Sequence, residues 1–490
     1  MNNQYDVIVI GAGIGGATCA ALLQRRGIHT LLVDKNSVPG GKAITVQKEG
    51  FRYELWPICG GPSLNSQFAA VLAELGVEDE VRLLTPEKAT MLMYRQAGSE
   101  AYEGRVSAAV PTPEGPMAIL EVLRLQAESL TEVARLFTDL LQFTPGEVER
   151  LDDVPFSEFL ARYELPRPLV SYLGMWSNIV FVVPIDLLAT SEAVKTFQDF
   201  AAGGAARYHS GGYGRVAEAC CEALQRFGGT LQLKTRVEGI RVMDGAVAGI
   251  ATDQGRFDAP IVVSNAGIQP TVLRLIGAEH FDRSYVSYVR GLVPSWGIMG
   301  IRYFLDKPFF EYPMYLAFSD ESYVDTKLFL RMKAGHVPDE LMVFNVVPAV
   351  YDPSLAPPNK QCALVGTICS PDPDLSYQET MWQKLDTMVT RLWPGIEKCV
   401  TAKERYSTRH VSSLTRDAVL PGQGGECIGL GQIVGQCGKE KPAARAPLRG
   451  LFFVGCDAGG YGCGTHQAAD SGVKVAKLVE REHRIRATAY

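Results

Sequence analysis

Residues 5–41, YDVIVIGAGIGGATCAALLQRRGIHTLLVDKNSVPGG, decide the fold of this chain. The β-branched run Val7 to Ile10 predicts a strand that is buried on both faces. A small-residue pattern from Ala17 to Arg26 predicts a helix, and Thr30 to Val33 predicts a second strand ending at Asp34. A strand, a helix and a second strand in this order predict the first unit of a parallel α/β sheet.

The turn between the first strand and the helix has the G-x-G-x-x-G spacing of a dinucleotide site. Gly11 permits the tight turn, Gly13 allows the backbone to approach a pyrophosphate, and Gly16 allows close packing of helix on strand. The free N–H groups at the helix start, around Ile14 and Gly15, attract the phosphates. We therefore predict that these five residues bind a dinucleotide rather than form a simple glycine-rich turn.

The second strand ends in an acidic residue, as such sites require. Asp34 is placed to accept hydrogen bonds from a ribose hydroxyl, and Lys35 follows it. Pro39-Gly40-Gly41-Lys42 then brings a second glycine pair and a cation near the same phosphates. Here the chain resembles the FAD-binding amine-oxidase and phytoene-desaturase superfamily, whose second strand runs into a P-G-G-[RK] segment. The resemblance implies FAD rather than NAD, with Gly41 and Lys42 in the site.

Composition limits the classes of function. The chain has 490 residues, is 47% hydrophobic and 21% charged, and carries a net charge of −6. The length allows two or three domain-sized units with a large core. An acidic balance gives no basic face for nucleic acid, so we expect no nucleic-acid partner.

The eleven cysteines show neither C-x-x-C pairs nor zinc-like spacing, so we predict no metal site. The chain enters its first strand at Tyr5 without a basic and then apolar leader, so we expect reduced thiols and a cytoplasmic setting. The most apolar segment, Leu169 to Leu188, is interrupted by polar residues and a proline, which argues against a spanning helix. We interpret it as the buried wall of an apolar cavity, with peripheral membrane contact as the alternative.

Further segments match the same superfamily. After a predicted strand, Ala43 to Lys48, the turn Gly60-Gly61-Pro62 resembles a flavin-adjacent turn of the relatives, and Trp56 is either a ring-site or a core residue. The block from Tyr208 to Ala266 resembles the family's sequence of glycine pair, helix, glycine turn, hairpin and V-V-x-N-A strand. The resemblance implies that the backbone of Val237 contacts adenine and that Asn265 returns the chain to the nucleotide domain.

The C-terminal block has the family's frame of a G-L-F-F-V-G strand, a glycine-rich loop and a helix. The resemblance places Gly455, Asp457, Gly464 and Thr465 in the FAD site, with Asp457 near the ribityl or pyrophosphate groups. The helix that starts near Thr465 would direct its N–H groups at the flavin ring. Relatives carry small apolar or proline-containing sequence where this chain has His466-Gln467, so these two are the candidate catalytic residues. A capping or hydrogen-bonding role for His466 is the alternative.

The predicted fold is α/β: a Rossmann-like FAD-binding domain of the GR2 type with an inserted α+β substrate domain. We divide the chain into FAD-binding segments and substrate-domain segments. The FAD-binding segments are 1–66, 205–290 and 415–490; the substrate segments are 67–204, rich in helices, and 291–414, a mixed sheet plus helix. Gly429 to Gly435 has a nucleotide-like glycine spacing but no preceding strand, so we interpret it as a loop.

The resembling families are phytoene desaturases, carotenoid isomerases and retinol saturases. They imply an FAD-dependent oxidoreductase that desaturates, saturates or isomerises a hydrophobic carotenoid, isoprenoid or lipid by hydride transfer at the flavin. The alternatives are an amine-oxidase-like enzyme with a smaller polar substrate and an aromatic pair at the ring, for which Trp56 and Tyr461 are available, and a non-catalytic flavin-binding scaffold. The electron acceptor is left open between quinone, oxygen and a protein.

Overall fold

The computed structural model describes residues 4–56, 58, 67–86, 88, 90–107, 115–204 and 207–488. Its first sheet is parallel, with strand order β19-β13-β1-β2-β9. The predicted strands appear as β1 (Val7–Ile10), β2 (Thr30–Val33), β13 (Ile261–Ser264) and β19 (Leu451–Phe453), with β9 (Thr230–Gln232) at the edge. Strands from the beginning, middle and end of the chain therefore share one sheet.

Alternation along β1 explains the two layers that cover this sheet. Val7 and Val9 belong to the core formed with the helices, whereas Ile8 and Ile10 belong to a second core on the opposite face. The helices are α1 (Ile14–Arg25), α2 (Gln67–Leu75), α9 (Gly214–Arg226) and α16 (Thr465–Ala487). A three-stranded antiparallel sheet, β10 (Val237–Met243), β11 (Ala246–Thr252) and β12 (Gly255–Asp258), covers the other face. Both faces of the parallel sheet are thus buried, as the β-branched run predicts.

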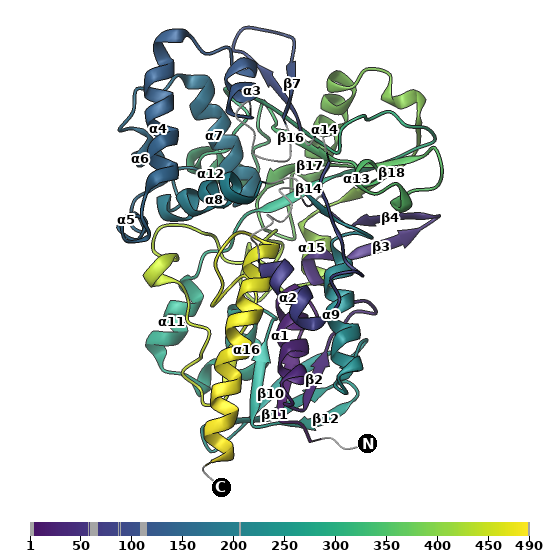
Figure 1. The fold of residues 1–490 in the computed structure, drawn as a ribbon, viewed down its shortest axis with the longest axis vertical. Helices are drawn as coiled ribbons and strands as arrows, with labels where there is room; N and C mark the ends of the chain where they lie inside the picture. The colour runs from purple at the N-terminus through teal and green to yellow at the C-terminus, as the bar shows by residue number, and fades with distance from the viewer. Residues whose placement is uncertain are drawn as a thin grey trace.

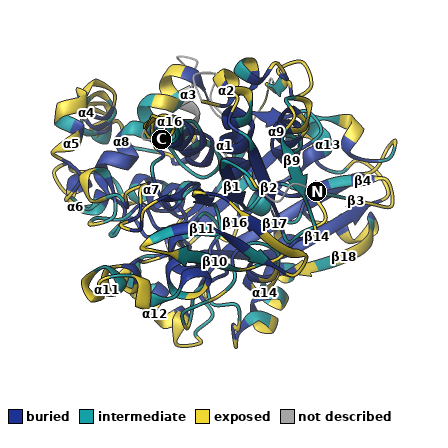
Figure 2. Cartoon of the chain, turned by 90° about the horizontal axis from the view of Figure 1, so that it is seen from below, coloured by how far each residue is buried: buried dark blue, intermediate teal, exposed yellow. Residues whose placement is uncertain are grey.

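The arrangement is visible in two views. In Figure 1, α1 and α16 lie side by side in the lower part of the molecule, and both termini lie at its lower end. Figure 2, seen from below, shows β1 and α1 in dark blue at the centre, with yellow segments at the periphery.

The upper part contains a mixed sheet of order β18-β14-β17-β16-β15-β6-β7. Both sequence regions assigned to the substrate contribute strands: β6 (Thr90–Arg95) and β7 (Glu103–Ser107) come from the first, and the others from the second. The others are β14 (Gly297–Leu305), β15 (Met314–Ser319), β16 (Val343–Val346), β17 (Gln361–Cys369) and β18 (Val400–Tyr406). The parallel pairing of β15 with β6 ties the two regions together.

The segment from Pro116 to Phe143 contains two helices, α3 (Gly115–Val122) and α4 (Leu130–Gln142). Arg124 between them has a positive φ of 51°, which a right-handed helix does not accommodate. A short helix, α6 (Phe156–Leu160), begins directly after Pro155. Periodicity reports the apolar face of a segment but not a short break between two helices on the same face.

The remaining elements complete the two lobes. Helices α7 (Arg167–Val180) and α8 (Thr190–Gly203) lie in the upper lobe, with α14 (Gln378–Leu392) near the mixed sheet. The others are β3 (Thr45–Lys48), β4 (Phe51–Glu54), β5 (Leu83–Leu84), β8 (Tyr208–His209), α5 (Pro145–Glu149), α10 (Ile268–Pro270), α11 (Arg283–Gly291), α12 (Thr326–Lys333), α13 (Pro348–Tyr351) and α15 (Thr408–Leu414). In the described part of the chain, no helix combines the length and apolarity needed to cross a bilayer.

The five-segment division made from the sequence stays a prediction. The structure adds that α2 packs on α1, α9 and α16, in the lobe of the parallel sheet. It also shows that the cavity described next draws on segments of both lobes.

Candidate functional site

A cavity opens at the carboxyl ends of the parallel strands. The last residues of β1 and β2, Ile10 and Val33, line it, as do Asn265 and Val454, which follow β13 and β19. This edge of a parallel sheet is where nucleotides bind in α/β folds, because the helix N-termini converge there. The predicted site residues that line the cavity are Gly11, Gly13, Ile14, Gly15, Asp34, Lys35, Gly41, Lys42, Val237, Asn265, Gly455, Asp457, Gly464, Thr465 and His466.

Two glycine loops meet in the cavity wall. Gly40 donates its N–H to the Ala12 carbonyl at 2.9 Å, and a Cβ on Gly41 would lie 3.1 Å from the Gly13 Cα. Gly16 does not line the cavity: a Cβ there would lie 2.0 Å from the Gly11 carbonyl oxygen, so it serves the close helix packing predicted for it. Side chains at these positions would hold the two loops apart and fill the space beside the N-terminus of α1.

Asp34 lies where a ribose-binding carboxylate is expected, but its carboxylate also accepts hydrogen bonds from the protein backbone. Its Oδ2 accepts the Ala12 N–H at 2.7 Å and its Oδ1 accepts the Asn36 N–H at 2.8 Å. Burial raises the pKa of this carboxyl, although the two hydrogen bonds act to lower it. The carboxylate therefore fixes the first glycine loop and retains acceptor capacity toward the cavity.

Asn265 joins three separate segments of the chain. Its Nδ2 donates to the Gly11 carbonyl at 3.2 Å, and its backbone N–H donates to the Ile10 carbonyl at 2.8 Å. A Cβ on Gly455 would lie 2.4 Å from the Asn265 Oδ1, and Gly455 has a φ of +104°. The amide thus sets the distance between the N-terminal glycine loop and the C-terminal strand.

Asp457 lines the cavity, and its carboxylate also connects several segments of the protein. It accepts hydrogen bonds from Arg416 Nη1 at 3.0 and 3.2 Å, from the Ile268 N–H at 2.9 Å and from the Leu430 N–H at 3.1 Å. The Arg416 Nε also pairs with Glu426 at 2.9 Å. Although burial disfavours its charge, these two carboxylates hold the pKa of Arg416 above its ordinary value. The contact of Asp457 with the ribityl or pyrophosphate groups, which the resemblance implies, stays a prediction; the structure shows that this cavity-lining carboxylate also positions Arg416.

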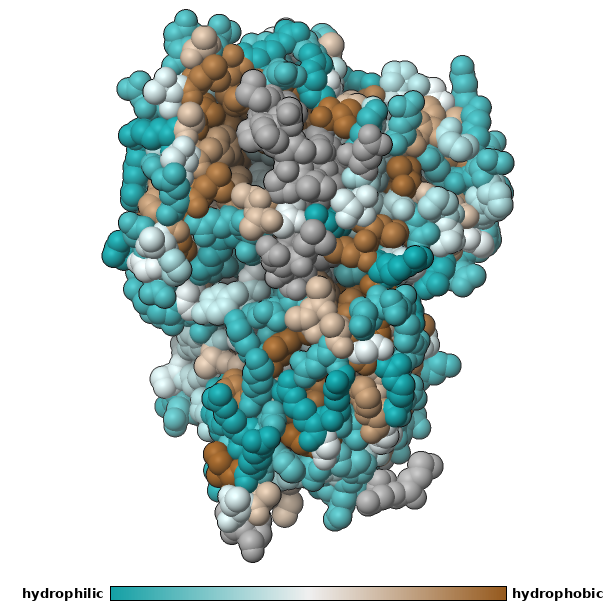
Figure 3. Space-filling view, in the orientation of Figure 1, coloured by the Kyte–Doolittle hydropathy of each residue, from teal (hydrophilic) through white to brown (hydrophobic). Residues whose placement is uncertain are grey.

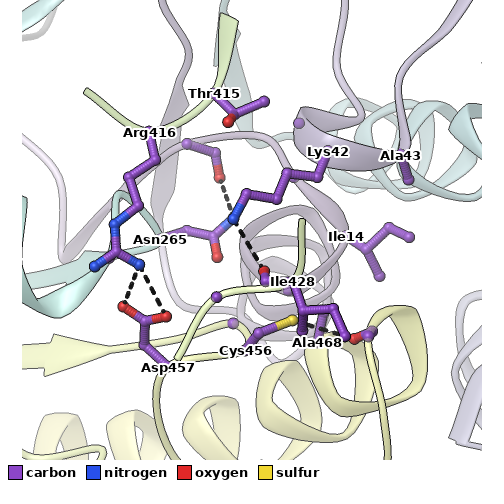
Figure 4. A pocket seen from close by; sticks show the side chains of 18 of the residues that line it. Ile14, Lys42, Ala43, Asn265, Thr415, Arg416, Ile428, Cys456, Asp457 and Ala468 are labelled. Carbon is purple, nitrogen blue, oxygen red and sulfur yellow. Dashed lines mark hydrogen bonds and ion pairs between the residues drawn. The ribbon is translucent and has the colours of Figure 1, made fainter. Parts of the chain in front are cut away.

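Figure 4 shows a second cation, Lys42, extending across the cavity toward the segment that carries Ile428. Its Nζ donates to the Ile428 carbonyl at 3.1 Å and lies 3.9 Å from Glu426 Oε1. Close by, the Cys456 thiol donates to the Gly464 carbonyl at 3.2 Å, and burial raises the pKa of that thiol to about 12. A neutral thiol and a tethered ammonium therefore line this part of the site.

The N-terminal turn of α16 faces the cavity through Gly464, Thr465 and His466. The ring of His466 packs edge-on against Phe68, with 5.4 Å between ring centroids. Gln467, the other candidate catalytic residue, is only 1% exposed and does not line the cavity. Of the two candidates, His466 alone is positioned to contact a bound molecule.

The remaining wall is largely apolar. Most of its residues belong to or pack against the core of the upper lobe, whereas Ile58 packs against the core of the parallel sheet. Ile179, Val180 and Val182 lie within the segment interpreted from sequence as a cavity wall, and they line it. The other apolar wall residues are Trp56, Ile58, Phe200 and Ile298, and a single carboxyl, Asp199, stands among them with its pKa raised by burial. Gly429, from the glycine-spaced loop, lines the same cavity, so this loop completes the first site.

Two predicted residues, Gly60 and Gly61, lie outside the described residues. Sequence reasoning missed Arg416 and Asp417, and it missed the cations Arg236 and Arg274, all of which line the cavity. Arg236 directly precedes the predicted adenine contact Val237, so its position in the sequence could have identified it as a residue of the site. Arg416 and Asp417 belong to a loop that carries no motif.

The cavity fits FAD by its own chemistry. Glycines surround the N-terminus of α1, where a Cβ on Gly13 would approach the Asn265 amide to 2.9 Å and a Cβ on Gly15 would approach the Gly455 Cα to 2.9 Å. Two helix N-termini, those of α1 and α16, open into one cavity. Helix N–H groups and dipoles favour anions such as a pyrophosphate and the reduced flavin.

Comparisons with known proteins agree with this assignment. The family model described as flavin containing amine oxidoreductase matches residues 14–271, just over half of the chain. A phytoene desaturase of Cercospora nicotianae is 26% identical over 86% of this chain and 70% of its own length. The lycopene-forming phytoene desaturase of Pseudescherichia vulneris is 23% identical over 94% and 95%, and prolycopene isomerase 1 of an Oncidium hybrid is 26% identical over 97% and 84%.

Solved structures share the fold. An oxidoreductase of Methanosarcina mazei aligns with a TM-score of 0.74 at 18% identity, covering 97% of this chain and all of its own. Putrescine oxidase aligns with a TM-score of 0.67 at 16% identity, covering 98% and 99% of the two chains. Given the matched family model, the glycine loops and the shared fold, this chain belongs to the flavin-containing amine oxidoreductase family and is an FAD-dependent oxidoreductase.

Proposed function

We propose that this enzyme changes C=C or CH–CH bonds of a hydrophobic unsaturated substrate, a carotenoid or a related isoprenoid or lipid. The observation that carries the proposal is the apolar wall formed by Trp56, Ile179, Val180, Phe200 and Ile298 in the same cavity as the two glycine loops. Apolar walls of this kind bind ligands by burying hydrocarbon surface, at about 25 cal/mol per Å². The names of the desaturase and isomerase relatives support the same substrate class.

An amine-oxidase-like reaction on a polar substrate is less well supported. It calls for an aromatic pair at the ring, and Trp56 is buried in the cavity wall. Tyr461, the other candidate, is 47% exposed and lies between three lysine ammonium groups at 4.0 to 5.4 Å from its ring centre. Within the described residues, Tyr461 does not line the cavity, so the two aromatics do not form such a pair.

We assign roles to the lining residues on this basis. The two glycine loops and the N-terminus of α1 hold the pyrophosphate, Asp34 and Val237 hold the adenosine, and the N-terminal turn of α16 faces the flavin ring. When bound, FAD supplies hydride transfer. The protein contributes burial of the hydrocarbon, exclusion of water, and titratable groups at the apolar wall, of which His466 and Asp199 line the cavity.

Anaerobic substrate screening tests the proposal. Purified holoenzyme is reduced by light, and its flavin absorbance is then followed after addition of polyenes or isoprenoid lipids in one series and small amines or alcohols in the other. Oxidised enzyme is screened in parallel for bleaching. A response to polyenes or lipids alone supports the proposal, whereas a response to amines or alcohols alone contradicts it. Flavin that responds to neither class in either redox state would favour the scaffold function.

The electron acceptor and membrane contact form part of the proposal. Reoxidation rates with quinone, oxygen and protein acceptors, compared on the same reduced enzyme, identify the acceptor. Peripheral membrane contact has a candidate surface in the upper lobe, where Figure 3 shows apolar side chains near α4, and Leu130 and Leu141 of that helix are 40% and 48% exposed. Co-sedimentation with phospholipid vesicles tests it, with Leu141→Ser as the variant expected to bind less.

A further inference from the structure

We propose that residues 414–417 form a strap across the adenosine end of the FAD cavity and that Asp417 is the positioning residue that fastens it. All four residues of the strap, Leu414, Thr415, Arg416 and Asp417, line the cavity. The inference rests on the adenosine placement proposed above, at Asp34 and Val237. It does not depend on the identity of the substrate.

Three cations from three different elements converge on Asp417. Lys35, after β2, places its Nζ 2.9 Å from Oδ1, and Arg236, before β10, places its Nη1 3.2 Å from Oδ2. Arg274, from the segment that follows β13, places its Nη2 2.5 Å from Oδ2. These cations also line the cavity, so the carboxylate connects the segments that follow β2, precede β10 and follow β13 at the cavity wall.

The strap has a second, uncharged tie beside the first. Asn36 Nδ2 donates to the Leu414 carbonyl at 2.7 Å, and the Asn36 N–H is itself held by Asp34 Oδ1 at 2.8 Å. The predicted ribose carboxylate is therefore connected through one residue to the strap. On the other side, the buried pair of Arg416 with Asp457 fixes the strap to the C-terminal strand region.

The two attachments differ in their exposure to solvent. Arg416 and Asp457 have side-chain exposures of 8% and 6%. Asp417 has an exposure of 22%, and its partners Lys35, Arg274 and Arg236 have exposures of 16%, 42% and 50%. Salt screens exposed pairs and leaves buried pairs nearly unaffected. The Asp417 attachment is therefore the one that opens more readily at high ionic strength, while the Arg416 attachment acts as the hinge.

Although burial disfavours its charge, the hydrogen bonds from Lys35 and Arg274 hold the pKa of the Asp417 carboxyl below its ordinary value. The fastening carboxylate is thus charged at neutral pH. Three cations outnumber the two carboxyl groups at this end of the cavity, Asp417 and Asp34, and this balance suits an anionic cofactor and does not by itself close the opening.

The test measures the rate of FAD release from holoenzyme. Holoenzyme is diluted into buffer containing an excess of an unrelated apoprotein that binds FAD tightly, and the change in flavin fluorescence gives the dissociation rate constant at about 50 mM and 500 mM salt. Asp417→Asn is expected to raise the rate constant at low salt about 10-fold or more. Wild-type release is expected to accelerate with salt, and release from the variant is expected to depend on salt much less.

Three further variants test whether the change in FAD release is specific to the strap. Asp417→Glu keeps the charge and is expected to retain most of the slow release, and Asn36→Ala, which removes the uncharged tie, is expected to raise the rate about 3-fold. Asp153→Asn removes the exposed pair with Lys439, which does not line the cavity, and is expected to match wild type. Melting temperatures of the flavin-free proteins show whether Asp417→Asn folds like wild type.

Release from Asp417→Asn within 2-fold of wild type would overturn the proposal. Slower release would overturn it as well, because it would mean that the carboxylate mainly repels the phosphates. If Asp417→Asn fails to fold, the salt dependence of the wild type and the Asn36→Ala rate decide, and a salt-independent wild-type rate refutes the strap. An enzyme that holds FAD but ignores polyenes would refute the proposed function and leave this result unaffected.

Discussion

Substitution of Asp457 by asparagine tests whether the buried ion network holds the site together. Asp457 is 5% exposed and accepts hydrogen bonds from the Arg416 guanidinium and from two backbone N–H groups, those of Ile268 and Leu430. The amide group of asparagine would present an N–H₂ where one of those donors now points. The substitution therefore removes a charge and leaves at least one buried donor without an acceptor.

The expected cost follows from the geometry. Breaking a buried ion pair by removing one partner costs about 3–5 kcal/mol, because the other charge stays buried. Arg416 retains Glu426 at 2.9 Å, so we expect the lower end, about 3 kcal/mol. An exposed pair contributes about 0–1 kcal/mol. Asp374→Asn is therefore the matched control, since Asp374 is 78% exposed in its pair with Arg409.

Urea unfolding at matched protein and FAD concentrations gives the measurement, because bound FAD stabilises the native state by mass action. Tryptophan fluorescence and far-UV circular dichroism are followed together, since a chain with two lobes need not unfold in one step. The double variant Arg416→Gln with Asp457→Asn is expected to cost less than the sum of the single variants, because the two residues share one network. A loss below about 1 kcal/mol for Asp457→Asn, or strict additivity, would refute the reasoning.

The other predictions concern the glycine contact, the cavity wall and a buried carboxyl. Gly15→Ala is expected to reduce bound flavin to a small fraction, because its Cβ would approach the Gly455 Cα to 2.9 Å; the ratio of flavin to protein absorbance measures this, and full occupancy would contradict it. Val180→Lys is expected to leave flavin content unchanged and to abolish turnover of the hydrophobic substrate, since an ammonium in an apolar wall opposes hydrocarbon burial. Burial raises the pKa of Glu54 above its ordinary value, despite the hydrogen bond from Tyr208, so the folded state binds this proton more tightly than the unfolded state. Its contribution to stability is therefore full below the ordinary glutamate pKa and is lost as pH rises through the raised value. Glu54→Gln should flatten that decline in unfolding midpoint, and parallel pH profiles would count against the assignment.

The agreement between sequence and structure is greatest where the backbone itself carries the signal. The β-branched runs at Val7 and Ile261 and the glycine spacing after Ile10 predict buried parallel strands and a phosphate-binding turn from local sterics alone. The structure confirms those strands, and it places Gly13 and Gly15 at the cavity, where an added Cβ would come within 2.9 Å of a neighbouring atom. These features are local, so a linear pattern contains them.

The sequence is less informative where the role of a side chain depends on its contacts with residues from distant parts of the chain. Asp457 has the position of a cofactor ligand in the sequence, and no linear pattern shows that Arg416, 41 residues away, binds the same carboxylate. Gln467 has the position of a catalytic group, yet helix α16 turns it into the interior. Adjacent residues on a helix point about 100° apart, so only the packing of the helix determines which of them faces the cavity.

The sequence by itself determined the strand–turn–helix unit, a dinucleotide-binding turn and the apolar character of the wall, because these depend on backbone sterics, glycine geometry and hydrophobicity. Only the tertiary structure decided that Lys35, Arg236 and Arg274 share one carboxylate and that both lobes enclose one cavity. The physical reason is that the partners of a charged side chain and the residues that enclose a cavity are set by proximity in space. These residues come from segments that are up to hundreds of residues apart in the sequence.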